Sequence, residues 1–334
     1  MPLAYSSDTL SIGTPGVDLD RLNDGLAGQG LGRALGSPRR VGTRLIVRVT
    51  GVEASAVRDR LPIDDVLLDP MLYNGATYWP DGAGEPLAFE ATELSPTALP
   101  AAAPWNPVPA GMRRPVVALL DCGVHDHPWL PRTNPADPFL LDAEDPALAD
   151  PWRPPPLIAA TSGHATFIAG IIRATAPSTR VLSVRVMDDR GAVHESTAVA
   201  ALEWLLRYRR DNPVDVVCMA FGRDPGTDDD RISLAELEKA VRDLVTDGAT
   251  VVASAGNDHA KQPVYPAGFH GVVAVGAGIG EYHARFSNWG GWVDRYREGI
   301  DIHGILPPDR YARWSGTSFS VAHYAGDLAR PQVV

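Results

Sequence analysis

Residues 314–326 read Trp-Ser-Gly-Thr-Ser-Phe-Ser-Val-Ala-His-Tyr-Ala-Gly, a tight Gly-Thr-Ser turn that leads into an apolar, helix-like segment. The turn places the hydroxyl of Ser318 at the N-terminus of the expected helix, where backbone N–H groups and the helix dipole favour negative charge. A serine at such a position is usually only an N-cap residue. A nucleophilic role requires a base, an orienting carboxylate and an oxyanion donor elsewhere in the chain.

The composition is that of a globular protein of one large or two small domains. The chain has 334 residues, of which 45% are apolar and 21% charged. A net charge of −11 argues against nucleic acid or an anionic membrane as the main partner. The start of the chain does not have the pattern of a signal peptide, and no run is apolar for long enough to span a membrane. We therefore expect a cytoplasmic location.

Residues 1–92 are expected to form a small α+β region. The strongest pattern is the alternation of residues 43–50, which predicts a strand. The first 40 residues are rich in Gly, Ser, Pro and Asp and are expected to be loop-like, with a short helix near residues 20–31. The weaker expectations are a helix at 52–61 and two short strands at 66–68 and 76–79.

A Pro- and Ala-rich linker is predicted at residues 93–114, because its proline density disfavours regular structure. From residue 115 to residue 334 strands alternate with helices, which predicts an α/β domain with a mostly parallel central sheet covered on both faces. The expected strands are 116–120, 180–187, 215–221, 249–255 and 271–277. The expected helices are 164–174, a helix capped by Ser196, and 232–247.

Three residues whose side chains could take part in catalysis lie where the expected strands end or the expected helices begin. Asp121 ends the apolar run 116–120, and a carboxylate there is costly unless it is paired. His164 opens an apolar helix beside a glycine, and Asn257 follows the strand at 249–255. Taken singly, each has an ordinary structural explanation as a cap, a turn former or a buried histidine. Ligand sites of α/β sheets lie at the carboxyl ends of strands, so the three residues are also candidates for one site.

Together these segments resemble the subtilisin-like serine proteases, the subtilases, over about residues 115–330. The motifs on which the resemblance rests occur in the same order as in the family, with Asp before His and His before Ser. Residues 117–123 resemble the family's Asp motif, 163–170 its His motif, 255–257 its oxyanion motif and 316–326 its Ser motif. The resemblance implies a three-layer subtilisin-like fold with a small N-terminal α+β region attached.

The resemblance also implies a role for each matching residue. Ser318 would attack the peptide carbonyl, His164 would transfer the proton, and Asp121 would orient the imidazole. Asn257 and the N–H of Ser318 would bind the oxyanion. The residues implied to line the substrate cleft are Met219, Ala220, Phe221, Gly222, Ala253, Ser254, Ala255 and Gly256.

The sequence departs from the family pattern near the expected site. Ala165 and Phe167 replace the usual glycine and second histidine of the His motif, and Cys122 replaces a Thr or Ser. None of these changes removes a group of the triad, so a serine endopeptidase, acting on a specific peptide or protein, is the expected function. The first alternative is a pseudoprotease that keeps the fold as a binding or regulatory module. An unrelated α/β hydrolase is disfavoured because no Gly-x-Ser-x-Gly elbow surrounds Ser318.

The expected partners follow from this interpretation. A peptide or protein would be the substrate, and the N-terminal region is a candidate occupant of the cleft, as a propeptide that is removed or as a permanent domain. No organic cofactor and no catalytic metal are expected. Calcium is common in the family, but the sequence has no acidic, glycine-containing calcium loop, and the run at 228–230 is more simply a solvated turn.

Overall fold

The computed structural model describes residues 4–13, 16–73, 92–94, 106–143, 163–188, 191–226, 228–280, 282–329 and 332–333. The larger sheet has the strand order β14-β13-β12-β11-β7-β9-β8. Its neighbouring strands are parallel except for β14, which turns back antiparallel to β13. The strands are β7 (Val116–Asp121), β8 (Leu140–Asp142), β9 (Arg180–Arg185), β11 (Val216–Met219), β12 (Thr250–Ser254), β13 (Val272–Ile279) and β14 (Tyr282–His283), with β15 (Arg295–Arg297) paired to β13.

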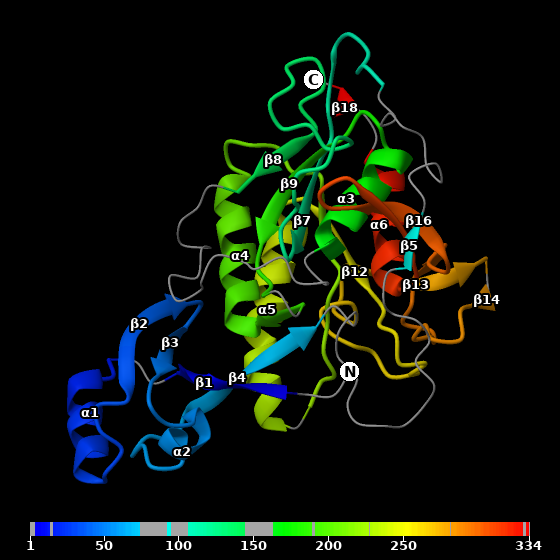
Figure 1. The fold of residues 1–334 in the computed structure, drawn as a ribbon. Helices are drawn as coiled ribbons and strands as arrows, with labels where there is room; N and C mark the ends of the chain where they lie inside the picture. The colour runs from blue at the N-terminus through cyan, green and yellow to red at the C-terminus, as the bar shows by residue number, and fades with distance from the viewer. Residues whose placement is uncertain are drawn as a thin grey trace.

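Helices cover both faces of this sheet, as Figure 1 shows. One face carries α3 (His164–Thr175) and α6 (Thr317–Leu328), and the other carries α4 (Glu195–Tyr208) and α5 (Asp228–Thr246). The central strands are continuous apolar runs because both of their faces are buried. The predicted three-layer α/β fold with a mostly parallel sheet is confirmed.

The N-terminal region forms a second, antiparallel sheet of order β10-β4-β1-β3-β2. The prediction that residues 1–40 are loop-like was wrong, because β1 and β2 lie there, although the expected helix is present as α1. The predicted strands at 43–50 and 66–68 correspond to β3 and β4. The elements are β1 (Ala4–Ile12), α1 (Leu19–Gly28), β2 (Leu35–Val41), β3 (Arg44–Val49), α2 (Ala54–Arg58) and β4 (Val66–Tyr73).

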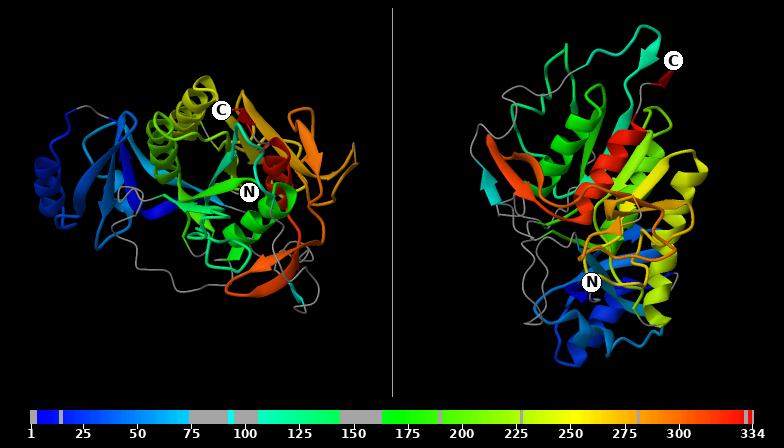
Figure 2. Two further views of the ribbon diagram at one scale, coloured as in Figure 1. Left: turned by 90° about the horizontal axis from the view of Figure 1, so that it is seen from above. Right: turned by 90° about the vertical axis from the view of Figure 1, so that its right-hand side faces the viewer.

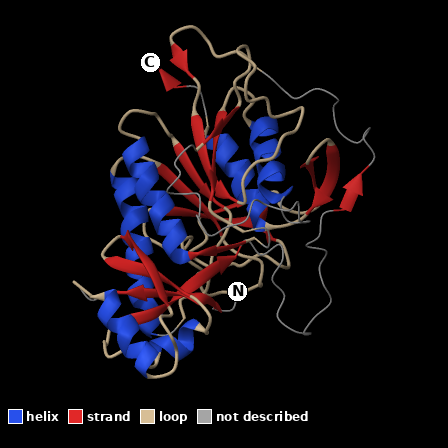
Figure 3. Cartoon of the chain, turned by 60° about the vertical axis from the view of Figure 1, so that its left-hand side comes forward, coloured by secondary structure: helices blue, strands red, loops and turns tan. Residues whose placement is uncertain are grey.

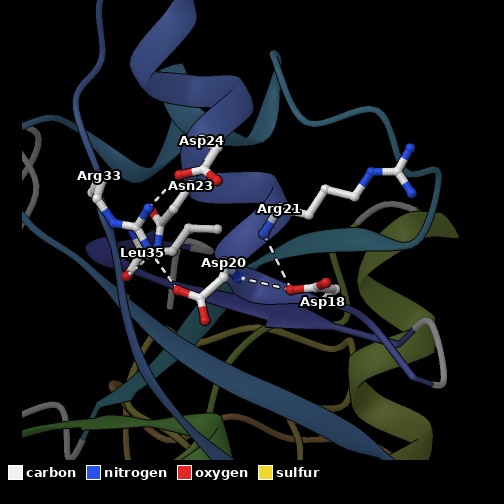
Figure 4. A network of polar contacts seen from close by, with 7 residues as sticks. All are labelled: Asp18, Asp20, Arg21, Asn23, Asp24, Arg33 and Leu35. Atoms are coloured by element: carbon white, nitrogen blue, oxygen red, sulfur yellow. Dashed lines mark hydrogen bonds and ion pairs between the residues drawn. The ribbon is translucent and has the colours of Figure 1, made fainter.

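Local polar contacts fix α1 against this sheet (Figure 4). Asp18 caps the helix by accepting hydrogen bonds from the N–H groups of Asp20 and Arg21. Asn23 is buried, and its amide exchanges two 2.8 Å hydrogen bonds with the backbone of Leu35. The N-terminal region therefore has its own polar contacts as well as its own apolar core.

One strand of the N-terminal sheet, β10 (Ala192–His194), comes from the later part of the chain and pairs antiparallel with β4. The sheet packs on α4 and α5, so it forms a further layer on that side (Figures 2 and 3). Asp69 of β4 accepts hydrogen bonds from the N–H and the hydroxyl of Ser196, in the first turn of α4. Ser196 is therefore not the cap that the sequence predicted; His194 occupies the N-cap position, and the carboxylate of Asp69 binds the helix start.

The predicted linker contributes strands at both of its ends. β5 (Thr92–Leu94) joins the hairpin of β16 (Ile302–Leu306) and β17 (Arg310–Trp314), pairing antiparallel with β17. β6 (Met112–Arg113) pairs with β18 (Gln332–Val333), and Arg113 forms an ion pair with Asp215. The expectation of no regular structure was therefore wrong at both ends.

Two further expectations concern a strand at residues 76–79 and the absence of a membrane span. The strand expected at 76–79 lies outside the described residues. Within the described ranges, none of the helices combines the length and the apolar character that a membrane span requires.

Candidate active site

Asp121 and His164 lie against each other in the interior. Asp121 is the last residue of β7, and His164 is the first residue of α3. The Nδ1 atom of His164 lies 2.9 Å and 3.1 Å from the two carboxylate oxygens of Asp121, and both side chains are buried. An ionised carboxylate only accepts hydrogen bonds, so the pair places the proton on Nδ1 and leaves Nε2 of His164 as the basic nitrogen.

Local backbone geometry holds the Asp121 carboxylate at the strand end. The N–H of Cys122 donates a 2.7 Å hydrogen bond to Oδ1 of Asp121. Gly123 then turns the chain with a φ of 93°, which is why a glycine is needed there. A Cβ atom at this glycine would lie 3.3 Å from the side chain of Arg185. The strand therefore ends sharply enough for its last side chain to face α3.

Ser318 is the second residue of α6 and is buried. Its hydroxyl lies 3.5 Å from the carbonyl oxygen of Ala220, which follows β11. The ring of Phe319, the next residue, lies 5.8 Å from the imidazole of His164. The helix start, the His164–Asp121 pair and the end of β11 therefore meet at one place in the fold.

The amide of Asn257 is oriented by Thr317. Both the N–H and the hydroxyl of Thr317 lie 2.9 Å from Oδ1 of Asn257. Because a backbone N–H can only donate, the atom that faces Thr317 must be the amide oxygen, and Nδ2 of Asn257 lies on the other side of the amide group. Thr317 Oγ1 also accepts a 3.2 Å hydrogen bond from the N–H of Gly256. Sequence reasoning did not identify Thr317, although its place beside Ser318 in the turn was a signal.

The eight residues expected to line the cleft lie at the ends of β11 and β12 or directly after them, and all are buried. Gly222 is closely enclosed, since a Cβ atom there would lie 3.1 Å from the carbonyl oxygen of Tyr265. Its neighbour Arg223 exchanges backbone hydrogen bonds of 3.0 Å and 2.8 Å with Tyr265. The chain after β11 is thus an extended edge.

The end of β4 occupies the free side of this edge. Tyr73 donates its N–H to the carbonyl of Gly222 and accepts the N–H of Gly222, and both distances are 3.0 Å. The pairing is antiparallel, which is the arrangement by which an extended peptide adds to a strand edge. Tyr73, the last residue of β4, therefore pairs with Gly222, which was expected to bind substrate.

A buried ion pair supports the same edge. Nε of Arg223 donates a 2.7 Å hydrogen bond to Glu195, the first residue of α4, and both side chains are almost completely buried. Arg223 also donates to the backbone carbonyls of Asp224 and Pro225. No local pattern in the sequence marks this pair, because its members are 28 positions apart and belong to different elements.

Aromatic rings surround His164 and explain one departure from the family pattern. Phe167 packs against Trp314 and Phe319 at centroid distances of 5.6 Å and 4.7 Å. Trp314 makes an edge contact with the ring of His164 at 5.7 Å. Space for Phe167 comes from Gly304, where a Cβ atom would lie 2.6 Å from the phenyl ring. Phe167 is thus part of the packing that holds the imidazole.

The remaining departures leave inert groups around the site. Cys122 is buried, and desolvation together with the nearby charge of Asp121 raises the pKa of its thiol well above the usual value. The N–H of Ala165 faces this sulfur atom, so Cys122 accepts a backbone contact at the start of α3. A thiol with a raised pKa is a poor nucleophile, so Cys122 is not itself a candidate nucleophile.

No candidate metal site is found in the part of the chain that the structure describes, where no three His, Cys, Asp or Glu side chains are grouped to hold an ion. The expectation that the protein needs no cofactor stays a prediction.

Comparison with known proteins identifies relatives of this chain. Residues 113–332 match the model of the family described as "Subtilase family". The chain is 33% identical over 234 residues to the "Thermophilic serine proteinase" of Bacillus sp. (strain AK1), covering 66% of this chain and 53% of that protein. It is 30% identical to "Subtilisin BL" of Lederbergia lenta, covering 64% of this chain and 74% of the relative.

A solved structure supports the fold alone. It is titled "Crystal structure of a cold adapted subtilisin-like serine proteinase" and superimposes with a TM-score of 0.51 at 24% identity. The match covers 63% of this chain and 72% of the other. The chain spans only about half the length of the thermophilic relative, so nothing is carried over from the rest of that protein.

Proposed function

Because the chain belongs to the subtilase family, the subtilisin-like serine proteases, we propose that it hydrolyses peptide bonds as a serine endopeptidase through Asp121, His164 and Ser318. The observation that carries the proposal is the buried Asp121–His164 pair, with its 2.9 Å contact to Nδ1. This pairing leaves Nε2 of His164 as the only ring nitrogen able to accept a proton.

The proposed reaction is acyl transfer in two halves. The Oγ atom of Ser318 attacks the carbonyl carbon while Nε2 of His164 takes its proton, and the carbonyl π electrons move onto the oxygen. The C–N bond then breaks as His164 gives the proton to the leaving amine. A water molecule repeats the sequence on the acyl-enzyme, which releases the carboxylic acid and restores Ser318.

The charge on the carbonyl oxygen would be bound by two donors. One is Nδ2 of Asn257, whose orientation is fixed by the hydrogen bonds from Thr317. The other is the N–H of Ser318 in the first turn of α6, where the helix dipole adds to the effect. Preorganised donors of this kind are usually the largest contribution to acyl-transfer catalysis.

We propose that the N-terminal region acts as a propeptide whose end lies along the cleft as a substrate would. Tyr73 pairs with Gly222 on the acyl side, and Ala220, two residues before Gly222, faces the hydroxyl of Ser318. Asp69 and β10 add further contacts to the same region. We place the maturation cut between Tyr73 and Thr92, because residues 92–94 belong to the β17 sheet that should stay with the peptidase.

The substrate would be bound as an extended strand along the backbone edge after β11, which recognises peptides in general rather than one side chain. We propose that specificity, and with it the processing of one particular peptide or protein, comes from other surfaces. Broad digestion of casein by the purified protein would contradict this selectivity but not the proposed chemistry.

The alternative is a pseudoprotease that keeps the fold for binding, which the replacements at Ala165 and Phe167 motivate. Hydrolysis of internally quenched peptides by the chain and by two serine variants separates the two functions. Ser318→Ala should abolish hydrolysis. Ser320 lies on the same helix, and its buried hydroxyl has no hydrogen-bond partner among the described residues, so Ser320→Ala should keep the activity. A folded wild-type chain, cut between Tyr73 and Thr92 and still inactive, would favour the pseudoprotease.

A further inference from the structure

Exposed apolar side chains gather at one place on the described surface. Four large apolar residues are exposed among the described residues, and three of them, Ile279, Tyr282 and Ile300, line the same cavity. Their exposed fractions are 72%, 86% and 55%. Apolar residues scattered singly need no explanation, but a contiguous group around a hollow usually marks a binding surface.

The cavity has a volume of about 250 Å³ and lies between the β13–β14 hairpin and residues 298–300. Ligand pockets for whole organic molecules are usually larger, at roughly 300–1,000 Å³. The volume of the cavity therefore suits one or two amino-acid side chains rather than a cofactor. Glu298 and His283 add polar groups to its wall.

Backbone pairing and ring stacking hold the wall formed by the hairpin. Gly278 pairs with His283, and a Cβ atom at Gly278 would lie 2.1 Å from the carbonyl oxygen of Tyr282. The ring of His283 stacks on Trp289 with a centroid distance of 5.4 Å and an interplanar angle of 4°. Beneath the hairpin lies a small buried apolar cluster of Ala277, Ala284 and Phe286. The exposed side chains of Ile279 and Tyr282 thus lie on a paired hairpin that packs on a buried apolar cluster.

The other wall is attached to the turn that carries Ser318. The carbonyl of Gly299 accepts a 2.8 Å hydrogen bond from the N–H of Gly316. The N–H of Asp301 donates a 2.9 Å hydrogen bond to the hydroxyl of Ser315. A Cβ atom at Gly299 would lie 2.2 Å from Oγ of Ser320, so this wall is in direct contact with α6. One wall of the cavity is therefore bonded directly to the turn that carries the proposed nucleophile.

The cavity lies on the side of Ser318 away from the acyl-side edge. That edge follows β11 and is occupied by Tyr73, whereas the hairpin is two strands further along the sheet, beyond β12. Figures 1 and 2 show β14 on the opposite side of the molecule from the N-terminal sheet, and β4 points from that sheet towards the centre. The hydroxyl of Ser318 lies 3.5 Å from the carbonyl oxygen of Ala220, after β11, and the turn that carries it is hydrogen-bonded to Gly299 in the cavity wall. A peptide that extends from the Gly222 edge beyond Ser318 would therefore approach the hairpin.

We propose that this cavity binds an apolar side chain of the substrate on the leaving-amine side of the scissile bond. The preferred substrate is then a polypeptide with an aliphatic or aromatic residue within a few positions after the cleaved bond. The inference rests on the proposed peptidase function for the identity of the ligand. A shallow apolar cavity with exposed aliphatic and aromatic walls gains free energy by covering such a side chain.

The hydrolysis test compares two classes of substrate. One is an internally quenched peptide with leucine or phenylalanine after the scissile bond, alongside a serine-substituted copy. The other is a peptide p-nitroanilide, which has no residues on the leaving side. For Ile279→Ser/Tyr282→Ser, KM for the apolar peptide should rise about 10- to 100-fold, since one apolar side chain loses its burial. The serine-substituted peptide and the p-nitroanilide should be unaffected. An equal change for all three substrates, or no change, would overturn the proposal.

A binding test works without catalysis. On a Ser318→Ala background, the fluorescently labelled leucine peptide should bind about 10- to 100-fold more weakly once Ile279 and Tyr282 are replaced by serine. If the double replacement weakens peptide binding although the wild-type chain hydrolyses no peptide, the proposed cavity stands and the peptidase function is refuted. A dimer in wild type that becomes a monomer in Ile279→Ser/Tyr282→Ser, with unchanged peptide binding, would show that a second copy covers the surface and would overturn the proposal.

Discussion

Tyr73 and Gly222 exchange both of their backbone hydrogen bonds at 3.0 Å, although they are far apart in the chain. The contact joins the last residue of β4 to the edge beside the proposed nucleophile. A strand edge of this kind can take only one extended chain at a time. Under the proposed function, the N-terminal region and a peptide substrate would therefore compete for the same hydrogen-bonding groups.

The first prediction concerns this competition. Tyr73→Pro removes one N–H donor, and a lost hydrogen bond of about 0.5–1.5 kcal/mol should weaken occupancy of the edge about 2- to 10-fold. The uncut chain should then hydrolyse a short peptide faster in the first minutes after purification. Tyr73→Phe keeps the backbone donor and serves as the control. Equal initial rates for all three proteins would argue against an occupied cleft.

The second prediction concerns the oxyanion donor. Asn257→Ala should lower kcat about 100- to 1,000-fold with little change in KM, because its amide acts mainly on the transition state. Loss of the asparagine donor of subtilisin, a member of the same family, has an effect of this size. Thr317→Val removes only one of the two bonds that orient the amide, so its loss should be smaller. Steady-state kinetics on a peptide p-nitroanilide measures both.

The third prediction concerns the packing around His164. Phe167 is completely buried between Trp314 and Phe319, so Phe167→Ala should lower the free energy of unfolding by about 3–5 kcal/mol. Urea unfolding of inactive Ser318→Ala proteins avoids self-digestion during the measurement. Phe167→Leu fills more of the space and should cost less. A loss below about 1 kcal/mol for the alanine variant would mean that the ring is not part of a tight core.

The fourth prediction is a loss of stability in acid that depends on His127. Burial lowers the pKa of His127 below its usual 6.5, and Nδ1 accepts a hydrogen bond from the N–H of Trp129, which requires a neutral acceptor. The unfolded chain therefore takes up the proton first as the pH falls. Above pH 6.5 the free energy of unfolding should not depend on the titration of His127. It should decline as the pH falls through and below that value.

His127→Asn keeps an acceptor for Trp129 and removes the titrating group, so unfolding free energies at pH 7.5 and pH 5.5 should differ less than in wild type. His270→Asn, which changes an exposed histidine, is the matched control. An unchanged difference in the His127 variant would refute this assignment. His323 is also affected in the same direction, because burial lowers its pKa.

The layers of the larger sheet were predictable because the signals are local. Apolar runs such as residues 116–120 identify buried strands, and the stripe of residues 232–247 identifies a helix. Of the N-terminal strands, β1 and β2 were missed, and for β2 there is a physical reason. β2 contains Gly36, Ser37 and Pro38, and it tolerates them because it is an edge strand with a register shift at that point.

The candidate site was predictable to the extent that its residues follow strands or open helices. Asp121, His164 and Ser318 each carry such a signal in their own segment. Contacts between distant segments leave no such trace. The pairing of Thr92–Leu94 with β17 and the contact of Asp69 with Ser196 depend on the tertiary fold, so neither followed from local pattern.

The most direct measurement of the central claim is labelling of the chain with a fluorophosphonate probe, read by intact mass. We predict one covalent adduct on wild type, none on Ser318→Ala, and a retained adduct on Ser320→Ala, because in the proposed mechanism only Ser318 uses the Asp121–His164 pair as its base. Mass spectra of the same samples should show a cut between Tyr73 and Thr92 in wild type and an uncut Ser318→Ala chain. An adduct that persists in Ser318→Ala, or none in a folded and cut wild type, would contradict the proposed role of Ser318.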